Sequence, residues 1–409
     1  MKKALVLAGG SDQIALISEL HKRQFTVYLV DYFDNPPARA FADKHIKGST
    51  LDIDFVTKTA IAENVDIIIT ACTDQALLTM AEVSEALSLP CYIPYLTARN
   101  VTNKSYMKKI MRENGIPTAD YHVVHDIEEI DIATLNYPIV VKPADCNSSK
   151  GVKKVTGAES AISTLKEALG LSRTHTAIIE DFKTGQELSA DFIVTGGRAR
   201  LLCVTESVKI PDNHGAFTIL QSSFPACTRQ EHTQIEQIGQ KIAEAFTLNE
   251  CPLLVQLIRA HDGMYVLEFS ARMGGGSKYK LIEVLSGIDI MSAYTDMALG
   301  KKVTVNPSRQ IKAAKMNYVY CRNGVLESLH NFEELKADGI IAEYFQYKTA
   351  GMTITGAETS GDRPAGFLIT GESEEEVCRK LAIADSRLQI ISDHKSDIMI
   401  HGLYNTSAS

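Results

Sequence analysis

One segment of the chain combines oxygen-bearing side chains with the pattern of a β-hairpin. In LLVQLIRAHDGMYVLEFSAR, residues 253–272, the loop 261–263 ends in glycine, as a three-residue hairpin loop with a left-handed position requires. In this register Gln256 faces Glu268 across the two strands, with Cβ atoms about 4.5–5.5 Å apart. An amide and a carboxylate oxygen so placed can share a hard divalent cation, which prefers oxygen ligands.

The alternation of side chains predicts that this hairpin is covered on both faces. Leu254, Ile258 and Val266 are expected on the face of Gln256 and Glu268, and Val255, Leu257, Leu267 and Phe269 on the other. A carboxylate buried there costs several kcal/mol unless a cation meets it. Ser270 projects the same way, and Arg272 adds a positive fork. A structural Glu268–Arg272 ion pair, or a wetter face, would explain the same pattern.

A second segment, PIVVKPADCNSSKGV, offers groups that bind polyphosphate. Lys142 ends an apolar strand, and the polar loop 145–151 follows it. The loop supplies backbone donors and hydroxyls from Asn147, Ser148, Ser149, Lys150 and Gly151. The Walker pattern GxxxxGK[ST] is absent. On its own such a segment is more often an ordinary loop than a phosphate site.

A third segment, AIIEDFKTGQELSADFIV, places acidic residues at a connection between two strands. Residues 180–183 join the strands, and Glu187 begins the second, where it can accept hydrogen bonds from a ribose diol. Taken alone, Glu187 is a surface glutamate. The basic residues of the helix predicted over 103–114 are interpreted as a solvated face: Lys104, Lys108, Lys109 and Arg112.

The elements that carry these segments follow a recognisable order. Residues 1–97 alternate short apolar runs with helical stretches, which predicts a doubly wound parallel sheet. Gly9-Gly10 and Asp31 suggest a dinucleotide fold, but no third glycine follows, and Asp12 would repel a pyrophosphate at the helix N-terminus. Asn103 caps the next predicted helix, which Gly115 follows.

Composition limits the class of protein. The chain has 409 residues, 45% of them hydrophobic, which excludes disordered and collagenous classes and predicts two or three domains. Its net charge of −8 argues against a nucleic-acid binder. Eight cysteines without a CxxC pair predict a reducing, cytoplasmic location. No apolar run approaches the roughly 20 residues of a membrane span, and the N-terminal run is interpreted as a first buried strand rather than a signal peptide.

Together and in this order, the segments resemble the ATP-grasp superfamily, from Met1 to about Gly300. The matching motifs are Asn103-Lys104, VVKP with its loop, IIEDFxxGxE, and Gln256 paired with ExxxR. The chain is most similar to the branch of carbamoyl phosphate synthetase, biotin carboxylase and the bacterial L-amino-acid ligases. The resemblance implies an α/β and α+β fold: a pre-ATP-grasp domain over 1–97, an ATP-grasp domain over 98–300 with a lid at about 118–182, and an α+β lobe over 301–409.

The resemblance also implies a set of site residues for ATP and Mg²⁺ or Mn²⁺. Lys104 and Lys142 correspond to lysines that contact the ATP phosphates, and the loop with Ser148, Ser149 and Gly151 to the flap over them. The backbone of Glu180, Asp181 and Phe182 corresponds to the segment that reads adenine, with Glu187 on the ribose. The metal ligands implied are Gln256, Glu268 and Ser270, the last in the place of the usual asparagine. Arg272, the catalytic residue implied together with Lys142, faces the transferred phosphate or the substrate carboxylate.

The implied reaction is ATP-dependent ligation of a small carboxylate and an amine through an acylphosphate. Segments 206–224, with Lys209 and His214, and 273–277 are the candidate acceptor pocket. Three alternatives stay open: a nicotinamide-dependent dehydrogenase, a bicarbonate-using carboxylase or carbamoyl phosphate synthetase-like enzyme, and a non-catalytic ATP-binding regulator. Neither a nucleic acid nor a membrane is expected as a partner. A homodimer is a family expectation.

Overall fold

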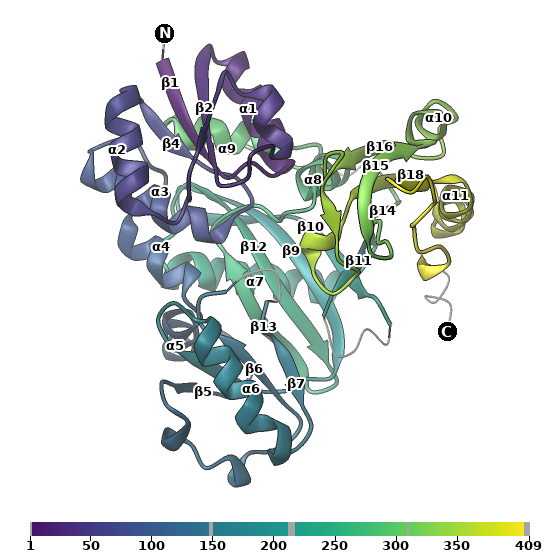
Figure 1. Ribbon diagram of the computed structural model, residues 1–409. Coiled ribbons are helices and arrows are strands. Elements are labelled where there is room, and N and C mark those ends of the chain that lie inside the picture. The colour runs from purple at the N-terminus through teal and green to yellow at the C-terminus, as the bar shows by residue number, and fades with distance from the viewer. Residues whose placement is uncertain (1, 147–149, 212–216, 309–310, 405–409) are drawn as a thin grey trace.

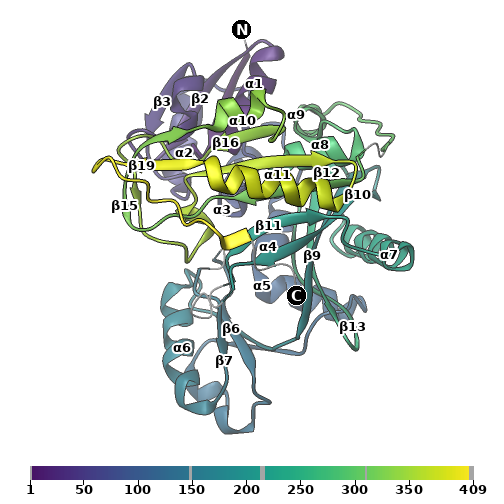
Figure 2. The same cartoon turned by 90° about the vertical axis from the view of Figure 1, so that its right-hand side faces the viewer.

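The computed structural model describes residues 2–146, 150–211, 217–308 and 311–404. The chain forms an N-terminal lobe, a lower lobe that projects from the centre, and a C-terminal lobe, joined by one long sheet (Figures 1 and 2). The mixed fold predicted from the sequence is confirmed, including its N-terminal parallel sheet. Among the described residues, no helix combines the length and apolar composition needed to span a bilayer.

The N-terminal lobe is a four-stranded parallel sheet in the order β3-β2-β1-β4. Its strands are β1 (Lys2–Leu7), β2 (Phe25–Asp31), β3 (Lys44–Lys47) and β4 (Ile67–Ile69). Its helices are α1 (Asp12–Lys22), η1 (Pro37–Phe41), α2 (Ile53–Glu63), α3 (Asp74–Ala86) and α4 (Tyr95–Thr102). The first strand is buried from Ala4 to Leu7, as its apolar run predicts.

The lower lobe is an antiparallel sheet in the order β5-β8-β6-β7. Its strands are β5 (Tyr121–Val124), β6 (Ile139–Pro143), β7 (Lys153–Val155) and β8 (Ala177–Asp181). Its helices are α5 (Lys104–Glu113), α6 (Ala158–Leu171) and the short η2 (Ile127–Glu129) and η3 (Ile132–Thr134). The predicted helix after Asn103 is confirmed: the Asn103 side chain accepts a hydrogen bond from Ser105 N, and Gly115 follows with φ +61°.

The central sheet has eight strands in the order β13-β12-β9-β10-β11-β14-β18-β16. Five come from the middle of the chain: β9 (Gly185–Thr195), β10 (Arg198–Lys209), β11 (Ile219–Phe224), β12 (Cys251–Ala260) and β13 (Gly263–Ser270). The other three, β14 (Ala313–Tyr318), β16 (Glu343–Gln346) and β18 (Ala365–Gly371), come from the C-terminal region. That region therefore extends the central sheet.

The remaining elements cover this sheet. Helices α7 (Arg229–Ala245), α8 (Lys278–Ser286) and α9 (Ile290–Ala298) come from the middle of the chain. The C-terminal region adds α10 (Phe332–Ala337), η4 (Ser360–Asp362) and α11 (Glu374–Arg387). It also holds a small sheet of β15 (Gly324–His330), β17 (Thr353–Ile354) and β19 (Gln389–Ser392).

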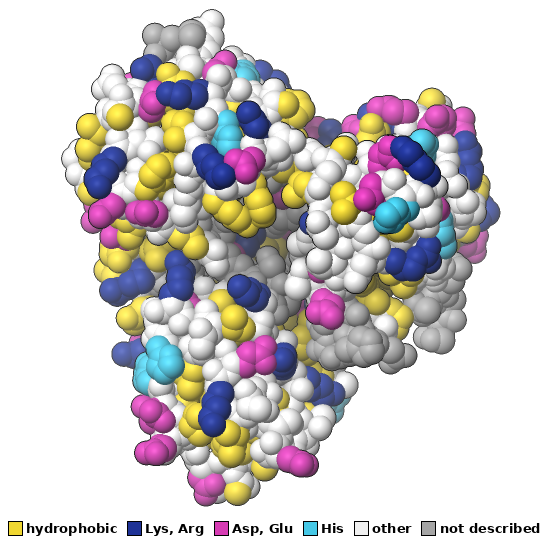
Figure 3. All heavy atoms as spheres, in the orientation of Figure 1, with side chains coloured by type: hydrophobic (Ala, Val, Ile, Leu, Met, Phe, Trp, Pro, Cys, Tyr) yellow, Lys and Arg dark blue, Asp and Glu magenta, His cyan; other side chains and the backbone are white. Residues whose placement is uncertain are grey.

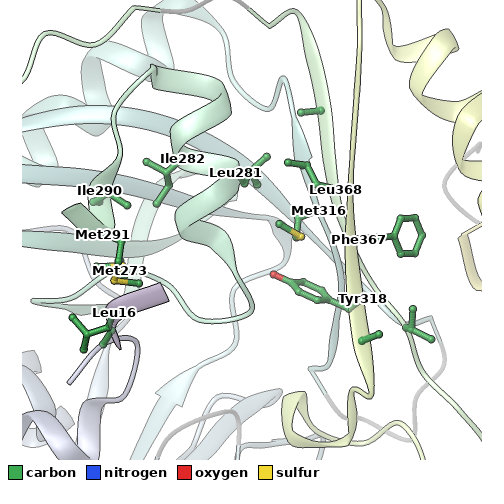
Figure 4. Packing of buried hydrophobic residues seen from close by; sticks show 14 of the residues in the cluster. Leu16, Met273, Leu281, Ile282, Ile290, Met291, Met316, Tyr318, Phe367 and Leu368 are labelled. Carbon is green, nitrogen blue, oxygen red and sulfur yellow. The ribbon is translucent and has the colours of Figure 1, made fainter. Parts of the chain in front are cut away.

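One buried core joins the N-terminal lobe to the C-terminal strands. Leu16 of α1 belongs to the same apolar cluster as Leu281 of α8, Met316 of β14 and Phe367 of β18 (Figure 4). Burying apolar area stabilises the folded chain by about 25 cal/mol per Å². Because this one cluster includes residues of the N-terminal lobe, the central region and the C-terminal strands, its burial stabilises their packing against one another.

The β12–β13 hairpin confirms the main sequence prediction and corrects its details. Gln256 pairs with Glu268, as predicted. The predicted three-residue loop is wrong, because Ala260 pairs with Gly263 and leaves a two-residue loop. A β-bulge at Leu267 supplies the extra residue and restores the register.

The bulge also changes which side chains share a face. Val266, predicted beside Glu268, pairs with Leu257 and is fully buried on the opposite face. Leu267, predicted on that opposite face, lines a cavity together with Glu268. Both assignments fail because one unpaired residue shifts the two-residue alternation of the strand.

Candidate functional site

Two adjoining cavities open where the three lobes meet, and the surface is hollowed there (Figure 3). The larger, of about 400 Å³, is lined by residues of all three lobes, among them Asp74, Arg272 and Arg363. The smaller, of about 150 Å³, is lined by Lys142, Glu187 and the β8 end at 180–182. Gln256 and Glu268 line both cavities, so they stand at the junction.

The β12–β13 hairpin can line the junction of the two cavities because only one of its faces is covered by other residues. Val255, Leu257 and Phe269 are buried in a core shared with α7. The face of Gln256 and Glu268 opens to the cavities, and the Glu268 side chain is 41% exposed. The prediction that both faces are covered is therefore wrong. A ligand in either cavity can therefore reach the Glu268 carboxylate.

The Glu268 carboxylate is well suited to a cation. Within the described chain it accepts no hydrogen bond, and the nearest cationic atom is Lys104 Nζ at 3.5 Å. Gln256 is its cross-strand partner and also faces the cavity. No group of three or more His, Cys, Asp or Glu side chains suited to a metal occurs among the described residues. A divalent ion here would thus bind through two protein oxygens and depend on a substrate for further ligands.

Ser270 and Arg272 are both bound to Asp74, the first residue of α3. Ser270 Oγ donates a hydrogen bond to Asp74 Oδ1, and Arg272 Nε donates to the same oxygen at 2.7 Å. Arg272 Nη2 forms an ion pair with Asp74 Oδ2. Although burial alone would raise the pKa of Asp74, the charge and hydrogen bonds of Arg272 hold it below its ordinary value. The guanidinium is thereby fixed in the wall of the larger cavity.

Asp74 was not identified from the sequence. An acidic residue in the first turn of a helix is common, because it complements the helix dipole. Nothing local connects Asp74 to Arg272, which lies 198 residues away. The sequence-level alternative of a Glu268–Arg272 ion pair is wrong, because no such contact occurs and Asp74 takes that place.

Two buried lysines share the carboxylate of Glu180. Lys142 Nζ lies 2.7 Å and Lys108 Nζ 3.1 Å from Glu180 Oε1. Lys108 is fully buried and also donates to Thr118 Oγ1 at 2.6 Å. The prediction of a solvated face is therefore wrong for Lys108 and for Lys104, which is 7% exposed, because β8 and the hairpin cover this side of α5.

The polar loop after β6 is held by hydrogen bonds at its first two residues. Lys104 Nζ donates to Cys146 O at 2.7 Å, and Asp145 accepts from the backbone N–H groups of Arg173 and Thr174. Gly151 has φ +73°, a left-handed conformation that favours glycine. Ser148 and Ser149 lie outside the described residues.

The end of β8 and the start of β9 line the smaller cavity. Asp181 N and Phe182 N donate to Asp120 O and Pro138 O, so these two N–H groups are already bonded within the lower lobe. Glu187 pairs with Lys209 at 2.9 Å. Lys209, assigned from the sequence to the acceptor segment 206–224, thus lines the smaller cavity, while His214 is not described.

The glycine-rich segment after Arg272 is fixed against the N-terminal lobe. Gly276 N and Ser277 N donate to Asp12 Oδ2 and Oδ1 at 3.0 and 2.8 Å. Asp12, at the N-terminus of α1, therefore joins the N-terminal lobe to the glycine-rich segment. The residues 274–276 line the larger cavity, as the acceptor-pocket prediction requires.

Comparison with known proteins identifies relatives of the chain. Residues 102–276 match the sequence model of the phosphoribosylglycinamide synthetase ATP-grasp (A) domain. The L-arginine-specific L-amino acid ligase of Bacillus subtilis is 25% identical over 312 residues, which is 73% of this chain and 74% of the relative. The crystal structure of L-amino acid ligase from Bacillus licheniformis superimposes with a TM-score of 0.78 at 21% identity, covering 96% of this chain and 99% of that one.

A further solved structure shares the fold. The biotin carboxylase domain of Hydrogenobacter thermophilus 2-oxoglutarate carboxylase, in complex with MgADP, ADP and bicarbonate, has a TM-score of 0.77 at 15% identity. The alignment covers 97% of this chain and 91% of that domain.

Proposed function

The chain belongs to the ATP-grasp superfamily, and from that premise we propose that it is an ATP-dependent ligase that joins a small carboxylate to an amine, with an amino acid as one substrate. The observation that carries the proposal is the convergence of Lys104, Lys142 and the Gln256–Glu268 pair on two joined cavities. The smaller cavity is proposed to hold the nucleotide and the larger one the carboxylate and the amine.

In the first step the substrate carboxylate attacks the γ-phosphorus of ATP, and ADP leaves. Phosphoryl transfer depends on positioning and on neutralising charge more than on a covalent catalyst. Lys104 and Lys142 are proposed to bind the phosphates, and Arg272, held by Asp74, to face the transferred phosphoryl group. Gln256 and Glu268, with Ser270 nearby, would hold Mg²⁺ or Mn²⁺, which neutralises negative charge on phosphate oxygens.

In the second step the amine attacks the acyl carbon, phosphate leaves and the nitrogen loses a proton. An acylphosphate exposed to water hydrolyses, so the site must exclude water. The loop 145–151, of which residues 147–149 are not described, is proposed as the flap that does so. The backbone at 180–182 is proposed to read adenine and Glu187 to bind the ribose.

We retain the domain limits 1–97, 98–300 and 301–409 as a proposal, with residues 118–182 as the lid. It is supported by β5 to β8, which form a sheet of their own. We also propose a cytoplasmic location, supported by the eight cysteines of the sequence, which contain no CxxC pair. A homodimer remains a prediction.

The decisive experiment measures ADP and phosphate release from ATP and Mg²⁺ with a panel of amino acids and small carboxylates, tested singly and in pairs. Product mass identifies any ligated compound. Release that needs a carboxylate and an amine together supports the ligase. Release with bicarbonate alone would instead support the second candidate, a carboxylase, which the likeness to a biotin carboxylase domain favours. Absence of release in every combination would indicate an ATP-binding regulator.

A further inference from the structure

Four cationic side chains line the larger cavity, and three of them have a carboxylate partner. Lys104 lies 3.5 Å from Glu268, Lys278 lies 2.7 Å from Asp191, and Arg272 is paired with Asp74. The fourth, Arg363, has no carboxylate within 4.0 Å in the described part of the chain, although it is only 7% exposed. A buried charge without a counter-ion is costly, so native proteins normally pair it.

The contacts of Arg363 orient its guanidinium without neutralising it. Nε donates to Tyr320 Oη at 2.7 Å, and Nη2 donates to Ile219 O at 2.9 Å. The guanidinium lies over the ring of Tyr318, 3.7 Å from the centroid. All three partners are uncharged, and Nη1 has no hydrogen-bond partner among the described residues. A guanidinium has five N–H donors, so donors remain for a ligand.

The carboxylate nearest to Arg363 in the sequence, that of Asp362, is hydrogen-bonded to two threonines instead. Asp362 accepts hydrogen bonds from Thr359 N, Thr359 Oγ1 and Thr355 Oγ1, each at 2.8 Å. It thus caps the short helix η4 and leaves the adjacent arginine without a partner. The fold holds Arg363 rigidly in the cavity wall with its positive charge uncompensated.

We propose that Arg363 binds a permanent oxyanion, a carboxylate or a phosphate, carried by a substrate in addition to the carboxylate that is activated. This inference rests on the proposed function, which places the reacting carboxylate next to Gln256 and Glu268. That carboxylate loses its charge when it becomes an acylphosphate, so it cannot be the lasting counter-ion of Arg363. Arg272 is already neutralised by Asp74. The C-terminal region therefore contributes a substrate-recognition residue to the cavity.

The test is a binding titration in which the nucleotide site is first saturated with Mg²⁺ and a non-hydrolysable ATP analogue. Inorganic phosphate is one probe, and amino acids compared with their C-terminal amides are the other. Preference for phosphate or for free acids identifies which oxyanion is bound. In Arg363→Gln we expect oxyanion affinity to fall about 10- to 100-fold, the range for a lost hydrogen bond to a charged group.

Two further variants complete the test. Arg322→Gln, an exposed arginine outside the cavity, should bind the oxyanions as the wild type does. Arg363→Lys keeps the charge but not the fork, and should bind with intermediate affinity; it also serves if Arg363→Gln fails to fold. Equal oxyanion affinity in wild type and both Arg363 variants, or no oxyanion binding by the wild type, would overturn the inference. If the ATP analogue itself does not bind, the proposed function fails, whereas the same titration of the unliganded protein still tests Arg363.

Discussion

Lys108 and Lys142 approach the same carboxylate oxygen, Glu180 Oε1, at 3.1 and 2.7 Å from two different elements. Burial would raise the pKa of Glu180, but the two lysines hold it below its ordinary value. If Lys142 turns from Glu180 toward a phosphate, Lys108 remains to balance the buried carboxylate. Lys108 therefore makes Lys142 available to the nucleotide.

The first prediction is that Lys108→Met raises the KM for ATP about 10-fold or more, because Lys142 becomes the sole partner of Glu180. Burial, reinforced by Lys142 and opposed by Glu180 and Glu268, lowers the pKa of Lys108 from 10.5 to about 8. The wild-type KM for ATP should thus rise as pH increases through about 8, where Lys108 loses its proton. Steady-state kinetics against pH should show this rise.

The matched control is Lys109→Met, because Lys109 lies on the same helix with a 69% exposed side chain. It should retain the wild-type pH profile, whereas Lys108→Met should lack the rise near pH 8. A Lys108→Met profile that coincides with the wild type would show that Lys108 does not act on Lys142.

The second prediction concerns the proposed metal site. Glu268→Ala should lower Mg²⁺-dependent turnover of ATP at least 10²-fold, the range found when a preorganised electrostatic group is removed. The fold should persist, because the Glu268 carboxylate accepts no hydrogen bond within the described chain and opens to the cavity. Circular dichroism and phosphate release measure the two effects. Glu236→Ala, half exposed on α7, is the control, and unaltered turnover in Glu268→Ala would remove the metal site.

The sequence could predict the Gln256–Glu268 pair because cross-strand pairing near a turn is a local property. It could not predict the bulge at Leu267, which distant residues hold: Val266 N donates to Pro117 O at 2.8 Å, and Thr118 Oγ1 donates to Val266 O at 3.1 Å. The predicted loop was one residue too long and the bulge adds one residue, so the two differences cancel at Glu268. Between the bulge and the turn they do not cancel, and Val266 was assigned to the wrong face.

The same limit explains the errors at Lys108 and Asp74. A helical period tells which side chains share a face, but not what packs on it, and β8 brings Glu180 onto the face that carries Lys108. Asp74 and Arg363 each have an ordinary local sequence, and only the tertiary structure brings them to the cavity. Motifs within one contiguous segment could be predicted from the sequence, whereas their charged partners from distant segments, such as Asp74 and Glu180, could not.

The third prediction is that Asp74→Asn destabilises the protein by about 3–5 kcal/mol, because it leaves Arg272 without its counter-ion. The double variant Asp74→Asn/Arg272→Met should cost less than the sum of the two single variants. Urea unfolding at neutral pH measures both values. Asp54→Asn, exposed on α2, is the control and should change stability little. Additive costs in the double variant would mean that the two residues are not coupled.

Asp74 should also contribute to acid unfolding. Its pKa is below the ordinary 3.8 when folded, because Arg272 outweighs the effect of burial. The unfolded chain therefore binds the proton more readily. The stabilisation by Asp74 is complete above pH 3.8 and is lost as pH falls through the lower folded value. Asp74→Asn should lack this component of the acid dependence, which urea unfolding across that pH window can detect.

The fourth prediction concerns Gly185, the glycine of IIEDFxxGxE, whose lack of a side chain lets β9 lie close to β12. A Cβ on Gly185 would lie 2.2 Å from the carbonyl oxygen of Arg259, a backbone atom of the neighbouring strand β12. Gly185→Ala must therefore separate β9 from β12, at a cost of about 1–3 kcal/mol. The shift moves Glu187, two residues along, away from its position in the smaller cavity, so the KM for ATP should also rise.

Gly170→Ala is the matched control, because a Cβ there meets nothing within 4 Å and alanine favours the helix by about 0.5–1 kcal/mol. Urea unfolding of both variants should give changes of opposite sign; a Gly185→Ala protein as stable as the wild type would show that the strands can adjust to the added methyl group.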